Sequence, residues 1–170
     1  MYPPVLKTNH LTLKPYTSDD EDRFIEMTLD IRSTQFMGGA SGNEIEERKL
    51  FKKGLEIYKR NDKRWFWLWG IYRGDLLCGH LEIKETDHTN NNELEIVYMV
   101  HPEERKKGIM TEVLSLLKQN QKNWHKRIIA TVNPKNLNSI SLLKKWGIDK
   151  KEILISSETG KKYFKLTLDE

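Results

Sequence analysis

The chain has 170 residues, of which 37% are hydrophobic and 32% charged, and this composition predicts one well-solvated globular domain with a sizeable core. It excludes a disordered chain, the single cysteine excludes an internal disulfide, and no apolar run approaches the roughly 18–20 residues of a membrane span. The formal net charge of +4 is compatible with nucleic acid, an acidic substrate or a phosphate-rich ligand, and alone it selects none of them.

The N-terminal third of the chain predicts one strand and two helices. Leu11–Leu13 is a short segment ended by Pro15, which is typical of a strand. Cap residues at 17–20 precede a first helix, whose apolar side chains recur at helical spacing: Phe24, Met27 and Ile31. Residues 43–59 predict a second, amphipathic helix.

The middle of the chain predicts three consecutive strands. The sequence WFWLWGIY at 65–72 is apolar on both alternating faces, so we expect it near the middle of a sheet that helices cover on each face. A turn at 73–75 leads to a partner strand at 76–84, and a polar turn then leads to a third strand at 93–100. The tryptophans of the first strand suit a stacking platform for bases or sugars, but a buried core is the more common explanation.

The C-terminal half alternates between helices and strands. A helix is expected from about residue 111 to 123 and a short one at 139–146, with strands at 127–132, 152–155 and 163–168. The expected order is therefore strand, two helices, three strands, helix, strand, helix and two strands. We expect this order to build a single domain over residues 1–170.

A strand that is followed by a basic, glycine-containing turn and then by a helix favours an anion-binding site. Here the strand at 93–100 is followed by Arg105-Lys106-Lys107-Gly108 and then by a helix. The first backbone N–H groups of a helix lack intrahelical partners, and the helix dipole adds partial positive charge there. Glycine permits a tight turn, and the three cations add attraction for phosphate. A solvated loop explains such a turn equally well when it is taken alone.

A second polar cluster, Asn136 to Ser139, lies between a predicted strand and a predicted helix. Its plain interpretation is a helix cap supplied by Asn138 or Ser139. Asn136 is not needed as the cap, so we expect its side chain to be free to hydrogen-bond a ligand.

Together the two clusters resemble the signatures of the GNAT superfamily of N-acetyltransferases, nearest to the branch of the ribosomal-protein N-terminal acetyltransferases and the spermidine acetyltransferases. The acetyl-CoA signature of that family, Arg/Gln-x-x-Gly-x-Gly/Ala, is matched by Arg105 and Gly108, with Met110 in the third position. The second signature of the branch, Asn-x-x-Ser-x-x-x-Leu-x-x-x-Gly-Phe, appears with isoleucine in the last position: Asn136, Ser139, Leu143, Gly147 and Ile148.

The resemblance implies one GNAT-like α+β domain, whose central mixed, mostly antiparallel sheet is flanked by helices and has a splayed strand pair for acetyl-CoA. Acetyl-CoA is then the co-substrate, with its pantetheine arm along the strand and its pyrophosphate on the basic turn. The implied binding residues are Tyr98, Met99, Val100, Arg105, Lys106, Lys107, Gly108, Ile109, Met110, Thr111, Asn136 and Ser139.

Two departures from the family pattern bear on function. Met110 replaces a small residue, and its side chain either crowds the pyrophosphate or turns into the core, so we expect weakened rather than lost cofactor binding. Leu143 stands where many relatives have a tyrosine that protonates the leaving thiolate. The acid is then solvent, Ser139 or a tyrosine from elsewhere in the chain.

Amine acetylation requires a neutral amine held against the thioester and the removal of one proton. Glu95 is our candidate for the base or the amine-orienting group, because some relatives carry a glutamate near the substrate amine. A surface acid at a strand edge explains it equally well. Glu82, on the neighbouring strand, is the substitute candidate.

The predicted function is an N-acetyltransferase that acts on a protein N-terminus, a polyamine or another small amine. The alternatives are a catalytically weak or inactive CoA-binding or regulatory module and a basic RNA-associated protein, which would lack the usual exposed aromatics. In this fold the substrate would be bound by the early helices and by the loops at 36–43 and 156–162. None of these segments has a sequence pattern that indicates a particular substrate. Acids on the second helix suit either a cationic amine or a solvated helix face: Glu44, Glu46 and Glu47.

We expect a cytoplasmic protein, because the N-terminus lacks the basic start and apolar core of a signal peptide. The Cys and His spacing indicates no metal site. The expected partners are a small-molecule or peptide amine, with no membrane and no direct nucleic-acid contact. Dimers are common among relatives, so a homodimer remains an open expectation.

Overall fold

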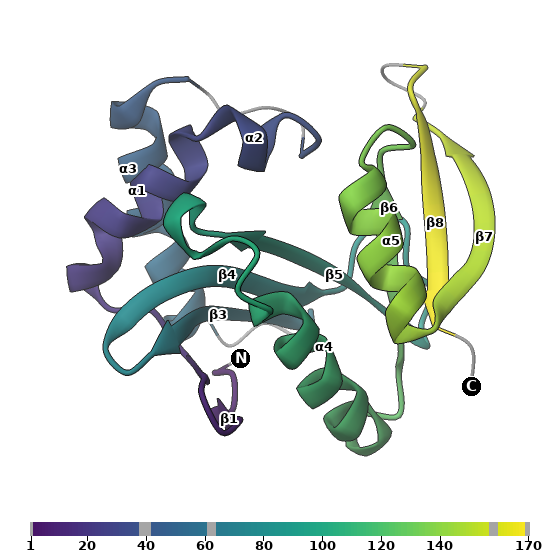
Figure 1. Ribbon diagram of the computed structural model, residues 1–170, viewed down its shortest axis with the longest axis horizontal. Helices are drawn as coiled ribbons and strands as arrows, with labels where there is room; N and C mark the ends of the chain where they lie inside the picture. The colour runs from purple at the N-terminus through teal and green to yellow at the C-terminus, as the bar shows by residue number, and fades with distance from the viewer. Residues whose placement is uncertain (1, 38–41, 61–63, 157–159, 169–170) are drawn as a thin grey trace.

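The computed structural model describes residues 2–37, 42–60, 64–156 and 160–168, and Figure 1 shows their arrangement. The strands form one eight-stranded sheet in the order β1-β2-β3-β4-β5-β6-β8-β7. They are β1 (Leu6–Lys7), β2 (Thr12–Lys14), β3 (Phe66–Arg73), β4 (Leu76–Lys84), β5 (Glu93–Val100), β6 (Arg127–Val132), β7 (Ile148–Ile155) and β8 (Lys162–Leu168). The α-helices are α1 (Glu21–Leu29), α2 (Ile31–Thr34), α3 (Glu44–Leu55), α4 (Ile109–Asn120) and α5 (Leu137–Trp146).

Four short 3-10 helices complete the described elements: η1 (Ser18–Asp20), η2 (Glu56–Lys59), η3 (Pro102–Glu104) and η4 (Gln121–Asn123). In the ranges that the structure describes, no helix combines the length and the apolar character that crossing a bilayer requires.

The element order confirms the predicted succession, with two additions. The structure adds the two-residue strand β1 and the single-turn helix α2, both of which are too short to show a periodic pattern. The first helix ends at Leu29, so the prediction that Ile31 belongs to its apolar side is wrong: Ile31 begins α2 and is exposed. Helix α4 also begins at Ile109, ahead of the expected start near Thr111. The reason is that Gly108, at φ 76°, takes the N-cap position in a left-handed conformation that favours glycine.

Strand β3 lies inside the sheet between β2 and β4, as its two apolar faces predict. Trp67 and Trp69 are buried in a large core, which α4 completes with Val113, Leu114 and Leu117. The alternate residues of β3 enter a smaller core with side chains from α1 and α3: Leu68 and Tyr72 with Met27 and Phe51. The sheet is therefore covered on both faces, and these tryptophans are core residues.

Strands β5 and β6 begin as neighbours and then separate. Their parallel pairing is limited to Glu93–Glu95 of β5 with Arg127–Ile129 of β6. Beyond that point β5 stays paired with β4 as far as Val100, whereas β6 pairs with β8. This is the expected splayed strand pair, and the separation between the two ribbons is visible in Figure 1.

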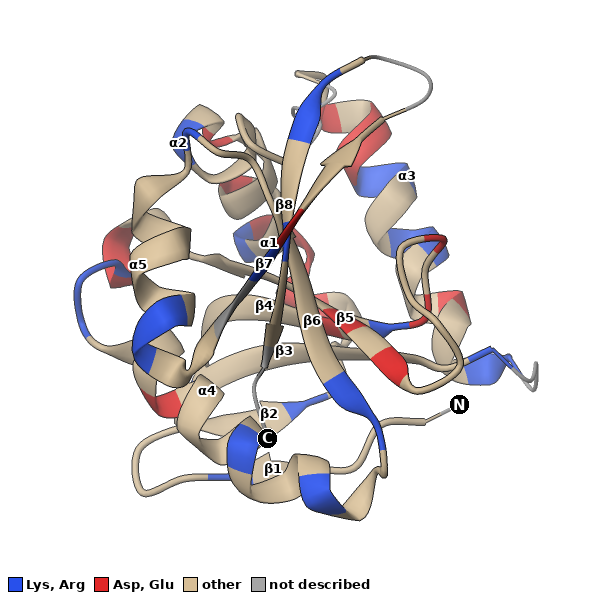
Figure 2. Ribbon diagram, turned by 90° about the vertical axis from the view of Figure 1, so that its right-hand side faces the viewer, with Lys and Arg blue, Asp and Glu red and all other residues tan. Residues whose placement is uncertain are grey.

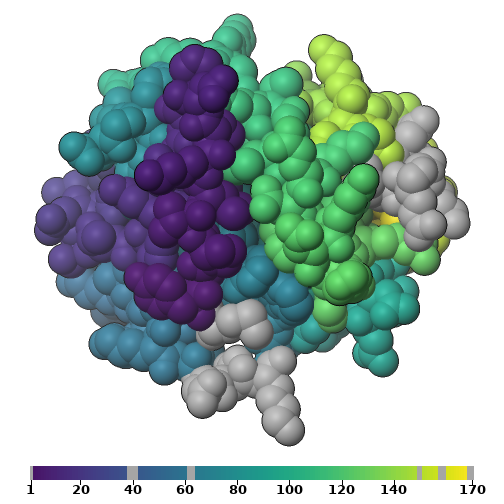
Figure 3. Space-filling view, turned by 90° about the horizontal axis from the view of Figure 1, so that it is seen from below, coloured from purple at the N-terminus to yellow at the C-terminus, as the bar shows by residue number. Residues whose placement is uncertain are grey.

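The N-terminal segment is fastened to α4. The hydroxyl of Thr8 donates to Oε1 of Glu112, and the backbone N–H of His10 reaches the same oxygen at 3.3 Å. Figure 3 shows the N-terminal residues lying beside the residues of this helix. Helix α4, whose first turn faces the splay, is thus held by the N-terminal segment as well as by the core.

Candidate active site

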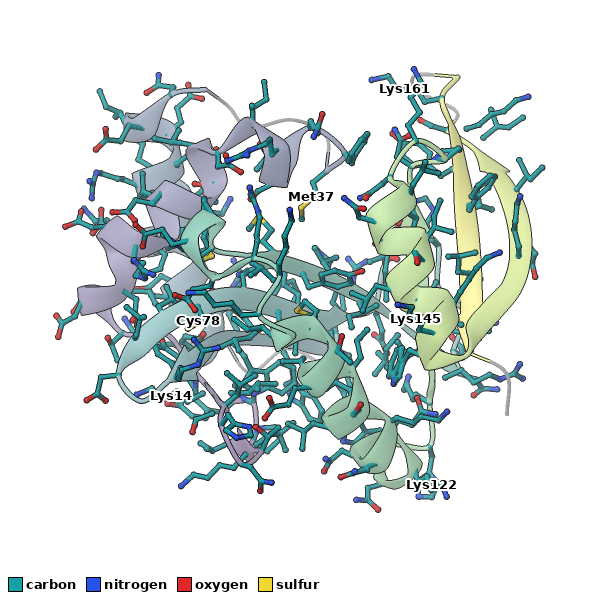
Figure 4. All side chains as sticks on the ribbon, viewed as in Figure 1. Lys14, Met37, Cys78, Lys122, Lys145 and Lys161 are labelled. Atoms are coloured by element: carbon teal, nitrogen blue, oxygen red, sulfur yellow. The ribbon has the colours of Figure 1, made fainter. Side chains whose placement is uncertain are left out.

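The divergence of β5 and β6 leaves a cavity of about 1350 Å³. All residues from Glu95 to Val100 line it, and successive side chains of a strand point to opposite faces, so the cavity reaches both faces of the sheet. On one face its walls come from α4 and α5. On the other they come from the α1–α3 region, and Met37 lies between α2 and α5 in Figure 4.

The structure brings nearly all of the predicted cofactor residues to this one cavity. Lys107 is the exception, because its ammonium turns to Glu104 at 3.0 Å and does not line the cavity. The others line it: Tyr98, Met99, Val100, Arg105, Lys106, Gly108, Ile109, Met110, Thr111, Asn136 and Ser139.

The first turn of α4 presents backbone N–H groups to the cavity. The first α-helical bond here runs from the N–H of Glu112 to the carbonyl of Gly108, so the amides of residues 109–111 have no partner of that kind. Met110 is only 6% exposed and packs in the core, so it does not crowd this turn as one of the two expectations had it. A Cβ built on Gly108 would meet no atom within 4 Å, which leaves open space beside the turn.

The sequence predicted that all three cations of the turn attract phosphate, but two of them pair with acids of the protein. The guanidinium of Arg105 binds the carboxylate of Asp30 and the hydroxyl of Ser33, the latter at 2.5 Å. Burial raises the pKa of Asp30, but the hydrogen bond and charge of Arg105 outweigh it and leave that pKa below its ordinary value. Lys107 is paired with Glu104, so Lys106 is the cation of the turn that lines the cavity and forms no ion pair with the described residues.

Asn136 is the N-cap of α5, which corrects the expectation that its side chain is free. Its Oδ1 accepts a hydrogen bond from the backbone N–H of Ser139 at 3.2 Å. The helix begins at Leu137, two residues before the expected start, and the cap moves back with it. Asn136 still lines the cavity, and its carboxamide carries two N–H donors in addition to the capping oxygen.

Tyr98 and Ser139 meet across the splay, a contact that the sequence did not foresee. The phenol oxygen of Tyr98 lies 2.7 Å from Oγ of Ser139, and both residues line the cavity. Burial raises the pKa of Tyr98, and the hydrogen bond of Ser139 only partly opposes this. Tyr98 therefore keeps its proton at neutral pH. Leu143 is fully buried and has no hydroxyl to offer.

Glu95 is a buried acid of the cavity, so the interpretation as a surface acid at a strand edge is wrong. The residue is only 5% exposed, and both of its carboxylate oxygens accept hydrogen bonds from threonine hydroxyls. Thr86 donates to Oε2 at 2.6 Å, and Thr131 of β6 donates to Oε1. The two hydroxyls fix the carboxylate at the point where β5 and β6 begin to part.

Sequence reasoning named Glu82 as the substitute candidate but missed the polar residues on either side of it on β4, His80 and Lys84. Nε2 of His80 lies 3.3 Å from Glu82, whose second oxygen binds Lys84 at 2.6 Å, and all three residues line the cavity. The hydroxyl of Tyr16 lies 3.0 Å from Nδ1 of His80. The alternation of polar with apolar residues over 80–84 could have indicated this face, but Tyr16 is 64 residues away in the chain.

The acids of α3 are mostly a feature of the helix itself. Glu44 and Glu46 are exposed in its first turn, where the helix dipole favours negative charge, and lysines follow later (Figure 2). Glu47 is buried and lines the cavity. The central residues of the two loops expected to grip a substrate, 38–41 and 157–159, lie outside the described part of the chain.

Solved structures of acetyltransferases share this fold. A GNAT-family acetyltransferase from Bacillus anthracis has 19% identity and a TM-score of 0.75, with 96% of each chain covered. An enzyme from Salmonella typhimurium that modifies the N-terminal serine of ribosomal protein L7/L12 has 13% identity and a TM-score of 0.76, covering 96% of this chain and 97% of the other.

A further ribosomal L7/L12 α-N-protein acetyltransferase, solved in complex with coenzyme A, has 13% identity and a TM-score of 0.74, again covering 96% of this chain and 97% of that one. No curated protein matches the sequence. The model of the acetyltransferase (GNAT) domain matches residues 10–149, which include the splayed strands, the basic turn and the α5 cap. The chain therefore belongs to the GNAT acetyltransferase family.

Proposed function

We propose that this protein transfers the acetyl group of acetyl-CoA to a primary amine: a protein N-terminus, a polyamine or another small amine. The observation that carries the proposal is the cavity at the diverging strands. It joins the first turn of α4, the edge of β5 and the N-terminus of α5 in one space. The family membership and the neighbour solved with coenzyme A support the choice of acetyl donor.

The residues present fit the chemistry of acetyl-CoA. Its pyrophosphate would accept hydrogen bonds from the amides of residues 109–111, with the ammonium of Lys106 as counter-charge. Its pantetheine amides would pair with β5 at 98–100, where β6 offers no partner. The open space beside Gly108 lets the phosphates approach the backbone closely.

The polar groups at the centre of the cavity then have distinct roles. Glu95, fixed by its two threonines, would orient the acceptor amine beside the thioester. The Tyr98–Ser139 pair would donate a hydrogen bond to the thiolate as it leaves, in place of the tyrosine that position 143 lacks. The thioester supplies the activated acetyl group, and the protein supplies position and hydrogen bonds.

Two measurements test the proposal. Acetyl-CoA at a hundredfold excess over its Kd is expected to stabilise the protein by about 2.7 kcal/mol, seen as a rise in Tm, whereas acetyl phosphate is not. Thiol release from acetyl-CoA is then followed with spermidine and with a peptide that has an N-terminal serine. Stabilisation without acetyl transfer to either probe would identify a non-catalytic CoA-binding module, and no stabilisation would contradict the proposal outright.

A further inference from the structure

Three ionisable side chains, Tyr16, His80 and Glu82, form a row of contacts in the cavity on the opposite face of β5 from the Tyr98–Ser139 pair. The hydroxyl of Tyr16 lies 3.0 Å from Nδ1 of His80, and Nε2 of the same ring lies 3.3 Å from Oε1 of Glu82. Tyr16 and His80 are each 5% exposed, yet all three residues line the cavity.

The side chains of His80 and Glu82 face the same side of the sheet as Glu95. Antiparallel register places Glu82 opposite Val97 and Lys84 opposite Glu95, and directly opposed residues share a face. The acceptor amine proposed above would approach the thioester at the splay from this face of the cavity. Glu95 itself has both oxygens occupied by threonine hydroxyls.

We propose that Tyr16, His80 and Glu82 form the proton relay of the acetyl transfer, with Tyr16 touching the acceptor amine and His80 taking the proton. This assignment rests on the proposed function. As the amine nitrogen bonds to the acetyl carbon and the C–S bond breaks, one N–H proton passes to the phenol oxygen. The proton of the phenol passes to Nδ1 of His80, and the thiolate leaves with the electron pair of the C–S bond. The imidazolium that forms lies against the carboxylate of Glu82.

The groups around Tyr16, His80 and Glu82 suit this direction of proton transfer. Burial opposes ionisation of Glu82, but the hydrogen bond and charge of His80, together with Lys84, lower its pKa to about 2. Glu82 is thus a fixed anion and a poor proton acceptor at neutral pH, and it favours the tautomer with hydrogen on Nε2. Burial, followed by nearby acids and tyrosines, holds the pKa of Tyr16 well above 10, so its hydroxyl passes a proton on without staying ionised.

Among the residues that the structure describes, the titratable groups that act on Tyr16 are Tyr72, Tyr58, Asp20 and Glu82, and Lys84 binds the second oxygen of Glu82. The helices α1 and α3 contribute apolar rings, with Phe24 and Phe51 at 5.6 and 5.7 Å from the ring of Tyr16, and β5 places Met99 opposite His80.

The backbone holds this geometry in place. The N–H of Tyr16 donates to the hydroxyl of Tyr58 at 3.0 Å, and that hydroxyl donates to the carbonyl of Leu68 at 3.0 Å. The phenol also lies 3.5 Å from the carbonyl of Gly79, a longer contact than the one to His80. These contacts fix the position of the Tyr16 backbone and of its hydroxyl beside His80.

The pH profile of kcat/KM separates a relay from a structural network. With spermidine or the serine peptide, whichever the protein acetylates, the kcat/KM of the wild type is expected to depend on the ionisation of a group of the enzyme as well as on that of the amine. His80→Gln and Tyr16→Phe should each lower kcat/KM about 100-fold and leave only the ionisation of the amine in the pH profile. Glu82→Gln should also lower kcat/KM, because the carboxylate that stabilises the imidazolium is gone.

His101→Gln is the matched control. This histidine is 2% exposed and pairs with Glu26 at 2.8 Å, but it does not line the cavity. It should lower the Tm and leave the shape of the pH profile unchanged. An active wild type whose profile survives His80→Gln would overturn the relay alone. A wild type that binds acetyl-CoA and acetylates neither probe would overturn the relay together with the proposed function.

Discussion

The hydroxyl of Tyr98 lies 2.7 Å from Oγ of Ser139, which joins the middle of β5 to the first turn of α5 across the splayed strands. We propose above that this contact takes the role that Leu143 leaves open, because both hydroxyls belong to residues that line the cavity. The pair is therefore the first target for substitution.

Tyr98→Phe and Ser139→Ala are expected to lower kcat by about 10- to 100-fold, with little change in the KM for acetyl-CoA. The reason is that the lost hydrogen bond forms only as the thiolate develops. Steady-state kinetics on the two single variants and the double variant measure this. If the double variant is no slower than either single one, the hydroxyls act as a unit, whereas fully multiplicative losses would contradict a shared role.

The turn before α4 allows a test with a closely matched control. Gly108→Glu should abolish the stabilisation by acetyl-CoA, because it places a carboxylate in the open space where the pyrophosphate would lie. Gly74→Glu is the control, since Gly74 also has positive φ, at 60°, also has no atom within 4 Å of a built Cβ, and lies outside the cavity. Thermal shift with and without acetyl-CoA reads out both. Equal ligand responses in the two variants would show that the turn does not bind the phosphates.

Local patterns were sufficient to predict most of the elements and to select residues that the structure brings to one cavity. Three of the informative features are properties of short segments: the two apolar faces of β3, the glycine at 108 and the polar cluster at 136–139. Local folding of each segment is enough to position its residues. The single-turn α2 escaped detection because four residues cannot display a period.

The contacts that set the chemistry could not be predicted in the same way. Arg105 finds Asp30 from 75 residues away and is thereby removed from the set of free cations. Tyr16 reaches His80 from 64 residues away, and Asn136 became a cap because α5 starts earlier than its apolar pattern does. Each depends on packing between elements, which no local pattern records.

Glu95→Gln tests whether the carboxylate orients the amine. The variant keeps the size of the side chain but loses the charge, and the hydroxyls of Thr86 and Thr131 must reorient around an amide. We expect kcat/KM to fall by about 10- to 100-fold at every pH, because an orienting group changes the rate without adding an ionisation. Near-normal kcat/KM across the pH range would remove Glu95 from the mechanism. Glu46→Gln, at an exposed site on α3, controls for the loss of one negative charge.

Glu82 should make the fold sensitive to acid. Its pKa falls from 4.5 to about 2 on folding, despite burial, because His80 and Lys84 bind the ionised form. A carboxyl with a depressed pKa in the native state contributes its stability above the unfolded pKa and loses it as the pH falls toward the native value. The contribution is about 3 kcal/mol, fully present above roughly pH 5 and lost progressively between about pH 4.5 and 2.

Urea unfolding of the wild type and Glu82→Gln over this range measures that contribution. Other buried or paired carboxyls also titrate here, so the informative quantity is the difference between the two proteins. The wild type should be the more stable of the two by a margin that shrinks as the pH falls from 5 to 2, whereas the exposed variant Glu46→Gln should follow the wild type throughout. A margin that stays constant over this range would mean that Glu82 is not held as an anion by His80 and Lys84. The relay would then lack the fixed charge that stabilises its imidazolium.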